Sequence, residues 1–309
     1  MKKEWVESLK KKKTCIWFIL PGFIIYTLFS IYPILSAVPN SFVKWGGIGK
    51  KQWVGFDNYI SLFTHPQLAP QFFNAAQNTL YYLVLNLVVI NALSILLAYL
   101  LFKGIPGYKP YKVIIFSPHF LYPTAIGFLY TLFFDPTIGL YSRFMTLIGL
   151  ESFRTFPWLS DPDMGIPLLL IVCTWKGIGY TMLLYLAGFT MVSKDYEDAA
   201  RIDGAGSLQL FFRIYLPMIR PTLSNVLVLT YIWCITLFDL PYVIAGREGG
   251  INRCMDVLET FFYRVTFSAT SGFAGNYVGI GSAISVCVFL VVLIGASAFL
   301  LATSSRKYD

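Results

Sequence analysis

The chain has 309 residues, of which 56% are hydrophobic and only 13% are charged. Soluble domains average about 25% charged residues, so this composition excludes a soluble domain and indicates an integral membrane protein. The net charge of +8 does not indicate nucleic-acid binding, because the cations gather at the ends of apolar segments rather than in a basic stripe.

The apolar segments predict an all-α membrane protein with six membrane-spanning helices. A lysine-rich N-terminus, residues 1–14, precedes an uncharged segment that is too long for a signal peptide and stays as the first span. Prolines are expected to bend the first span, at Pro21 and Pro33, and the third, at Pro118 and Pro123. The permease domain covers 15–302, with spans near 15–38, 75–102, 112–134, 166–190, 219–245 and 278–302, and 303–309 form a tail.

Polar side chains inside the spans are candidates for contact with a solute. Asn86 and Asn91 lie in the second span, where buried amides must find partners, so hydrogen bonding between helices is favoured over contact with a solute. Lys176 lies in the fourth span, and an ionisable group at that depth is a functional candidate. The candidate path residues are Asn86, Asn91, Tyr180, Tyr185, Asn225, Trp233 and Asp239.

The polar segment 195–217, DYEDAARIDGAGSLQLFFRIYLP, lies between the fourth and fifth spans. Asp195 can cap a first short helix, and Gly204 can interrupt it with backbone angles that other residues reach only with strain. Ser207 can begin a second helix, which Leu216-Pro217 is expected to end because proline has no amide hydrogen.

Within this segment, Asp198-Ala199-Ala200, Gly204 and Ile214-x-Leu216-Pro217 resemble the EAA loop of ABC importer permeases. Asp198 stands where the family has glutamate, with Glu197 beside it, a departure that keeps the negative charge. The resemblance implies a coupling loop that docks in a cleft of a cytoplasmic ATPase subunit. The residues assigned to this coupling are Glu197, Asp198, Ala199, Ala200, Asp203, Gly204, Ala205, Ile214, Leu216 and Pro217.

Four further segments, 53–63, 132–140, 174–188 and 238–250, resemble the sugar-type permeases that serve maltose, glycerol-phosphate and multiple sugars. The resemblance implies the type I ABC importer permease fold and half of the translocation path for a saccharide, of di- or oligosaccharide size. It also implies a second permease subunit, two ATPase subunits and an extracytoplasmic solute-binding protein as partners. In this family a lysine after tryptophan looks common, so Lys176 alone says little about an anionic substrate.

The chain contains no G-x-x-x-x-G-K-[ST] phosphate loop, so it is not expected to be an enzyme or to hold a cofactor. By the resemblance, ATP and Mg²⁺ are bound by the partner ATPase. The five cysteines show no Cys-x-x-Cys or Cys/His pairing, so neither a metal site nor a disulfide framework is predicted.

Lys and Arg residues are nearly twice as numerous in the N-terminus, the tail and the two segments predicted on their side as in the other loops. The positive-inside rule therefore predicts cytoplasmic termini and a cytoplasmic 195–217 segment. The resemblance to ABC importer permeases implies a bacterial inner membrane.

Three alternatives to a saccharide permease stay open. The same permease role can serve a glycerol-phosphate-like solute. A membrane-embedded transferase needs converging acids, bases or metal ligands, whereas Asp239 is nearly alone within a span. A secondary transporter or channel would work without an ATPase and would show an inverted repeat, and no convincing repeat is visible.

Overall fold

The structure is a computed structural model that describes residues 17–151, 156–159, 161–267 and 276–304. The described residues are helical apart from loops and one short hairpin, β1 (Val43–Lys44) paired antiparallel with β2 (Gln52–Trp53). The chain divides into two compact units, Met1–His65 with Val265–Cys287, and Pro66–Arg264 with Val288–Asp309.

The first unit is built around a long N-terminal helix and the beginning of α16 (Tyr277–Ser304). The N-terminal helix runs from Trp17 to Asn40 and passes Pro21 without a break. A π-helical stretch, η1 (Thr27–Ile31), precedes α2 (Tyr32–Asn40), whose first turn holds Pro33 and needs no amide hydrogen there.

A buried amide connects the hairpin of this unit with Asn276, the residue before α16. Asn58, in α3 (Asp57–Thr64), donates to the carbonyl oxygens of Ser41 and Val43 at 2.8 and 3.0 Å. Its own oxygen accepts a hydrogen bond from Asn276 at 2.8 Å. Gly279 allows this close packing, because a Cβ there would collide with the carbonyl oxygen of Val43.

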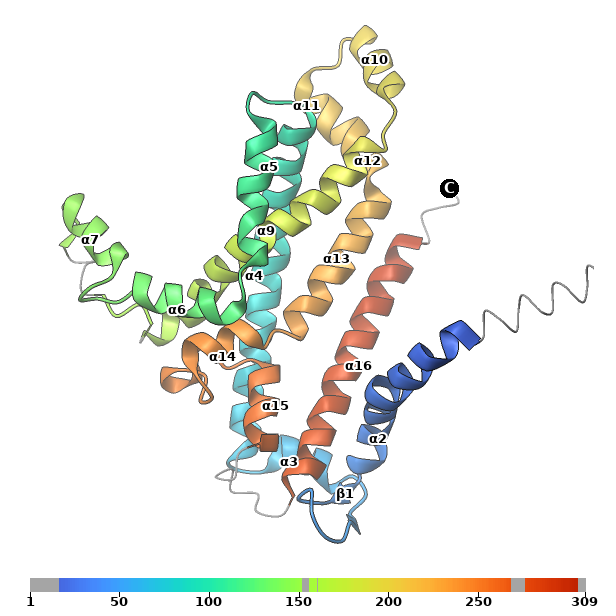
Figure 1. Ribbon diagram of the computed structural model, residues 1–309, viewed down its shortest axis with the longest axis vertical. Helices are drawn as coiled ribbons and strands as arrows, with labels where there is room; N and C mark the ends of the chain where they lie inside the picture. The colour runs from blue at the N-terminus through green and yellow to red at the C-terminus, as the bar shows by residue number, and fades with distance from the viewer. Residues whose placement is uncertain (1–16, 152–155, 160, 268–275, 305–309) are drawn as a thin grey trace, which may run out of the picture. The chain divides into compact units, whose positions relative to one another are not determined.

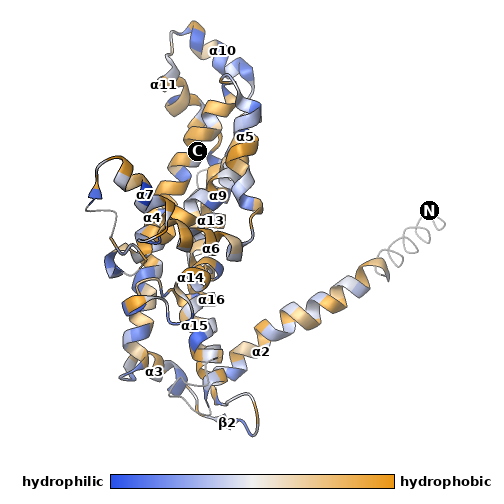
Figure 2. Ribbon diagram, turned by 60° about the vertical axis from the view of Figure 1, so that its left-hand side comes forward, coloured by the Kyte–Doolittle hydropathy of each residue, from blue (hydrophilic) through white to orange (hydrophobic). Residues whose placement is uncertain are grey.

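The second unit is organised around α4 (Leu68–Phe102), an unbroken helix of 35 residues, which packs along α9 (Gly165–Thr190) (Figures 1 and 2). α13 (Arg220–Ile235) packs against both. Small residues on α9 permit close packing: a Cβ on Gly188 would lie 2.8 Å from the hydroxyl of Thr222 on α13, and one on Gly179 would lie 2.6 Å from the backbone of Phe116, in the helix over residues 108–116.

Two of the expected spans are broken. α5 (Tyr108–Phe116) and η2 (Ser117–Phe120) are followed by α6 (Pro123–Phe133) after a bend of 98°, so the kink predicted for the third span is confirmed. The fifth span breaks at residues 236–238, between α13 and α14 (Asp239–Ala245), which the sequence analysis did not predict. Pro241 accounts for this break, because its ring would clash with the carbonyl group of Leu237 in a continuous helix.

Five helical segments of the described chain are long and apolar enough to cross a membrane, or six if the bent pair counts as one span. The predicted all-α membrane fold is therefore confirmed. The long segments are Trp17–Asn40, Leu68–Phe102, Pro162–Thr190, Arg220–Ala245 and Tyr277–Leu301, and the bent pair is Tyr108–Phe120 with Pro123–Phe133.

Shorter helices complete the second unit, and some of them lie in the segment between the last two spans. They are α7 (Leu140–Leu147), η3 (Pro162–Met164), η5 (Ile251–Arg253) and α15 (Leu258–Phe267), whose end passes into the first unit. Arg264 of α15 forms a bidentate ion pair with Asp256, and both side chains are almost fully buried. Asn78 of α4 donates to the carbonyl oxygens of Arg253 and Asp256, each at 3.0 Å.

Candidate functional site: the segment between α9 and α13, and the cavity

The segment after α9 begins with the helix α10 (Lys194–Ile202). Its N-cap is Ser193, whose hydroxyl accepts the amide hydrogen of Asp195 and donates to the Asp195 carboxylate. The expectation that Asp195 is the cap is therefore wrong. Ser193 has the extended backbone that a cap requires, and Asp195 lies in the first turn, where its charge suits the helix dipole.

Gly204 ends the first half of the segment, as predicted. Its φ of +81° is in the left-handed region, and the amide of Ala205 donates to the carbonyl of Ala200 at 2.9 Å, as in a glycine-terminated helix. The second half begins at Ser207, as predicted, and consists of α11 (Ser207–Gln209), η4 (Leu210–Tyr215) and α12 (Leu216–Met218).

The prediction that Leu216-Pro217 ends the second helix is wrong, because the chain stays helical through Met218 and turns at Ile219. η4 is π-helical and shifts the hydrogen-bond pattern just before Pro217. Pro217 therefore falls in the first turn of α12, where no amide hydrogen is needed.

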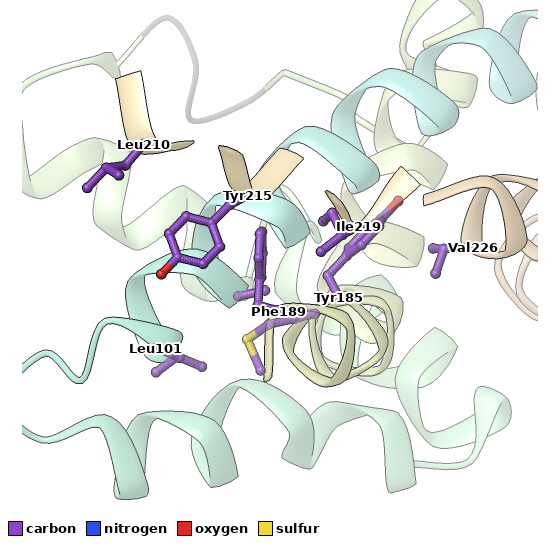
Figure 3. Close-up of a cluster of buried hydrophobic side chains, with 9 residues drawn as sticks. Leu101, Tyr185, Phe189, Leu210, Tyr215, Ile219 and Val226 are labelled. Atoms are coloured by element: carbon purple, nitrogen blue, oxygen red, sulfur yellow. The ribbon is translucent and has the colours of Figure 1, made fainter. Parts of the chain in front are cut away.

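The two halves differ in burial. Leu210, Tyr215 and Ile219 lie in the core with Ala98 and Leu101 of α4, as Figure 3 shows in part, together with Met182, Tyr185 and Phe189 of α9. α10 is mostly hydrophilic and lies with α11 at the end of the second unit (Figures 1 and 2). The second half thus anchors the segment in the helix bundle, and the first half stays accessible.

The predicted coupling residues follow this division. Asp198, Ala199, Asp203 and Gly204 are exposed, whereas Glu197, Ala200, Ala205, Ile214, Leu216 and Pro217 are half-buried. Four large apolar side chains of the segment, none of them among the predicted coupling residues, are also exposed: Tyr196 at 54%, Ile202 at 86%, Leu208 at 75% and Phe212 at 60%. Their signal in the sequence is an apolar residue within an otherwise polar segment.

Glu197 and Asp198 are neighbours with different surroundings. Glu197 accepts hydrogen bonds from Lys103 at 2.8 Å, from Arg201 at 2.7 and 3.0 Å, and from the hydroxyl of Tyr215. Partial burial raises the pKa of Glu197, but the hydrogen bonds from these three partners outweigh it and lower the pKa to about 2. Asp198 makes no side-chain hydrogen bond or ion pair with any described residue, so its carboxylate is available to a partner.

A cavity of about 350 Å³ lies in the second unit beside both helix breaks. Tyr82, Asn86 and Ile90 of α4 line one wall, and His119 lies at the break between α5 and α6. Residues 236–239, at the break between α13 and α14, also line it. Non-helical backbone at membrane depth is tolerated where it lines a cavity, and its free polar groups can bind a solute there.

Four of the seven predicted path residues line this cavity: Asn86, Tyr180, Trp233 and Asp239. The other three lie elsewhere. Tyr185 donates a hydrogen bond of 2.6 Å to Asn91, and both are buried between α4 and α9. Asn225 is exposed on α13.

The cavity combines aromatic faces with a few polar groups. The ring of Tyr180 stacks on His119 at 5.0 Å and contacts Trp233 at 5.2 Å. The amide of Asn86 donates to the hydroxyl of Tyr82 at 3.1 Å. Lys176 also lines the cavity, and it forms no ion pair with any residue that the structure describes. No group of metal-ligating side chains occurs among the described residues.

Comparison with known proteins places this geometry in a family. Residues 90–306 match the model of the binding-protein-dependent transport system inner membrane component family. The chain is 30% identical to the probable ABC transporter permease protein YurN of Bacillus subtilis, over 89% of this chain and 91% of that protein. It is 26% identical to the arabinooligosaccharides transport system permease protein AraP of the same organism, over 94% of this chain and 88% of that protein.

A solved structure shares the fold. The crystal structure of a bacterial ABC transporter involved in the import of the acidic polysaccharide alginate contains a chain that matches with a TM-score of 0.79 at 24% identity. The match covers 98% of this chain and 99% of that one.

The chain therefore belongs to the binding-protein-dependent inner membrane component family, and it is a multi-pass permease subunit of an ABC importer. The resemblance recognised in the sequence is confirmed. The family is not catalytic and carries no cofactor, because ATP is bound by the ATPase partners, as the sequence analysis predicted.

Proposed function

We propose that the chain forms half of the translocation path for a saccharide, most simply a di- or oligosaccharide. The observation that carries this proposal is the cavity, whose wall combines Tyr180 and Trp233 with Asn86, Asp239 and the broken backbone at 236–238. Aromatic faces suit the apolar faces of sugar rings, and amides, carboxylates and free backbone groups suit their hydroxyls. The relative AraP, named for arabinooligosaccharide transport, supports the same substrate class.

The complete importer in this proposal contains a second permease subunit, two cytoplasmic ATPase subunits and a solute-binding protein on the other side of the membrane. The termini and residues 195–217 face the cytoplasm. The excess of Lys and Arg on that side supports this orientation.

The ATPase docks on the exposed side chains of the coupling segment, on both α10 and α11. Ile202 and Leu208 supply apolar area on both sides of Gly204, and Asp198 supplies an unpaired carboxylate. Exposed apolar side chains beside a charge are the usual anchors of a protein interface. The proposal leaves Glu197 out of the direct contact, since its carboxylate is already occupied.

Docking is tested by co-purification of the ATPase with variants of the permease. Asp198→Arg and Ile202→Glu should each reduce the bound ATPase severalfold, since they place a repulsive charge at the interface. Glu248→Arg is the matched control, because it reverses one exposed carboxylate in the 246–256 segment, far along the chain. Equal ATPase retention by all three variants would contradict docking at this surface.

The substrate class is tested with the reconstituted complex and its binding protein. ATP hydrolysis should rise with one saccharide of a panel, and the Trp233→Ala variant should need more of that saccharide or respond less. A response confined to amino acids or peptides would be consistent with the permease role but would contradict a saccharide substrate.

A second candidate is an anionic solute, such as a glycerol-phosphate-like compound. Lys176 favours it, because an ammonium group without an ion-pair partner among the described residues lines the cavity. Lys176→Met should then abolish uptake of the anionic solute and spare neutral saccharides. Equal uptake of the anion by the variant and the wild type would exclude this candidate.

A further inference from the structure

Three polar side chains from different elements meet at the end of α4. Lys103 is the C-cap residue of α4, Glu197 lies in α10, and Tyr215 ends η4. The ammonium group of Lys103 lies 2.8 Å from the Glu197 carboxylate, and the Tyr215 hydroxyl donates to the other oxygen of that carboxylate. Lys103 also lies over the Tyr215 ring, 4.6 Å from its centre.

We propose that Lys103, Glu197 and Tyr215 form a latch that couples α10 to α4, so that movement of α10 during ATP hydrolysis reaches the cavity through α4. They are positioning residues, and this inference rests on the proposed coupling role of residues 195–217. The direct covalent connections of that segment lead only to α9 and α13.

The latch is the polar connection of α10 to the rest of the second unit. Among the described residues, every hydrogen bond between an α10 side chain and another helix runs through Glu197. These bonds are charge-assisted and partly shielded, with Glu197 17% and Lys103 26% exposed. Such bonds are stronger than pairs that are fully in water.

Tyr215 fixes the position of the Glu197 carboxylate in the latch. Its ring is 1% exposed and packs against Phe102, Tyr99 and Phe189, so the hydroxyl has a fixed position. A buried hydroxyl that loses its partner is destabilising, so Tyr215 favours one place for the Glu197 carboxylate. α10 therefore cannot shift against the bundle without breaking the latch or moving α4.

α4 can carry such a movement to the cavity. It is helical without a break from Leu68 to Phe102, and Tyr82, Asn86 and Ile90 on it line the cavity. At 1.5 Å per residue, Asn86 lies about 25 Å along the axis from the latch. α13, by contrast, is interrupted at the cavity itself, at residues 236–238.

The neighbouring carboxylates then have separate tasks. Glu197 connects the coupling segment to its own subunit, and Asp198 stays free for the ATPase. Among the described residues, the side chain of Arg201 bonds only to Glu197, within the same helix, and does not reach α4.

The test compares Lys103→Met with Arg201→Met in the assembled importer reconstituted in proteoliposomes. Each variant removes one cation from Glu197, but only Lys103→Met removes the ion pair that connects Glu197 to the end of α4. Lys103→Met should keep its bound ATPase and still hydrolyse ATP, while uptake per ATP falls by at least about fivefold. Arg201→Met should match the wild type, and Lys103→Arg should restore most of the coupling.

The latch would be overturned by wild-type uptake per ATP in Lys103→Met, or by an equal loss in Arg201→Met. A loss of bound ATPase in Lys103→Met would also overturn it, since Lys103 would then belong to the docking surface. Failure of the proposed function would show differently, because the wild-type complex itself would bind no ATPase or show no ATP-driven uptake.

Discussion

At the scale of single residues, the placement of carboxylates decides which of them serve structure and which stay available. Glu197 is held by Lys103, Arg201 and Tyr215, whereas Asp198 next to it has no such partner among the described residues. The sequence shows two adjacent acids and does not distinguish them. Lys103 is 94 residues from Glu197 along the chain, and no local pattern connects them.

The Glu197 cluster predicts an acid-sensitive contribution to stability. The pKa of Glu197 in the fold is about 2, below the 4.5 of an unperturbed glutamate. Its hydrogen bonds therefore stabilise the fold above about pH 4.5, and this stabilisation is lost as the pH falls towards 2. Lys103, Arg201, Tyr215 and Tyr99 are the titratable groups that face this carboxylate.

Thermal melting of the wild type and Glu197→Gln at several pH values checks this expectation. The wild type should melt higher at pH 7, and the difference should shrink steadily below about pH 4. A difference that stays constant between pH 7 and pH 3 would show that the carboxylate charge contributes nothing.

The buried pair of Asp256 and Arg264 predicts a larger effect. Asp256 is fully buried and Arg264 is 5% exposed, so removing either partner leaves a buried charge without compensation. Asp256→Asn should destabilise the protein by about 3–5 kcal/mol. Glu259→Gln is the matched control on α15, since burial raises the pKa of Glu259 and it has no ion-pair partner among the described residues.

Melting temperatures in detergent separate these variants. Asp256→Asn should melt well below the wild type, and Glu259→Gln close to it. Equal melting of Asp256→Asn and the wild type would contradict a structural role for the pair.

At the scale of elements, the sequence predicted helices, and their starts, breaks and kinks, where local chemistry controls them. The break at Gly204, the start at Ser207 and the kink of the third span follow from glycine, serine and proline. The cap at Ser193 and the continuation through Pro217 were missed, because each depends on neighbours that single-residue preferences do not describe. The signal for the break at 236–238 is Pro241, five residues after Thr236.

Gly204 and Gly206 provide a matched test of the coupling segment. Both have open space where a Cβ would be, but Gly204 has a φ of +81° and Gly206 one of −74°. Gly204→Ala should strain the left-handed backbone by about 1 kcal/mol, and Gly206→Ala should be nearly neutral. Gly204→Pro should uncouple ATP hydrolysis from uptake while the complex stays in the membrane, because it also removes the amide that bonds to Arg201.

Uptake and ATP hydrolysis of these three variants, measured side by side, check the expectation. Unchanged uptake in Gly204→Pro would contradict a rigid helix–glycine–helix unit in coupling. If Gly206→Ala lost as much uptake as Gly204→Ala, the effect would come from the added side chain rather than from the backbone angle at Gly204.

At the scale of the whole molecule, composition and apolar segments predicted the all-α membrane fold, because burying a backbone in lipid leaves few alternatives. The cavity was predicted only through individual residues. Asn86, Tyr180, Trp233 and Asp239 line it, but Asn91 and Tyr185 bond to each other instead. Which face of a helix meets a cavity depends on how helices cross, and apolar spans carry little periodicity to show it.

The proposed orientation predicts a labelling pattern. A cysteine at Ser207, in the exposed coupling segment, should react with a membrane-impermeant maleimide only from the cytoplasmic side. A cysteine at Gln52, exposed in the hairpin, should react only from the opposite side. Labelling of both from the same side would overturn the orientation.

The bend between α5 and α6 also sets an order of events during biosynthesis. α6 rests on α14, and Gly127 lies so close to Val243 that a Cβ on it would collide. α6 leaves the ribosome long before α14 is made, on the order of ten seconds at ordinary rates of translation. Throughout that interval its apolar surface depends on lipid or on the insertion machinery for cover. The packing of α6 against α14 therefore forms only after the fifth span has been made, although the prolines of the third span can bend it earlier.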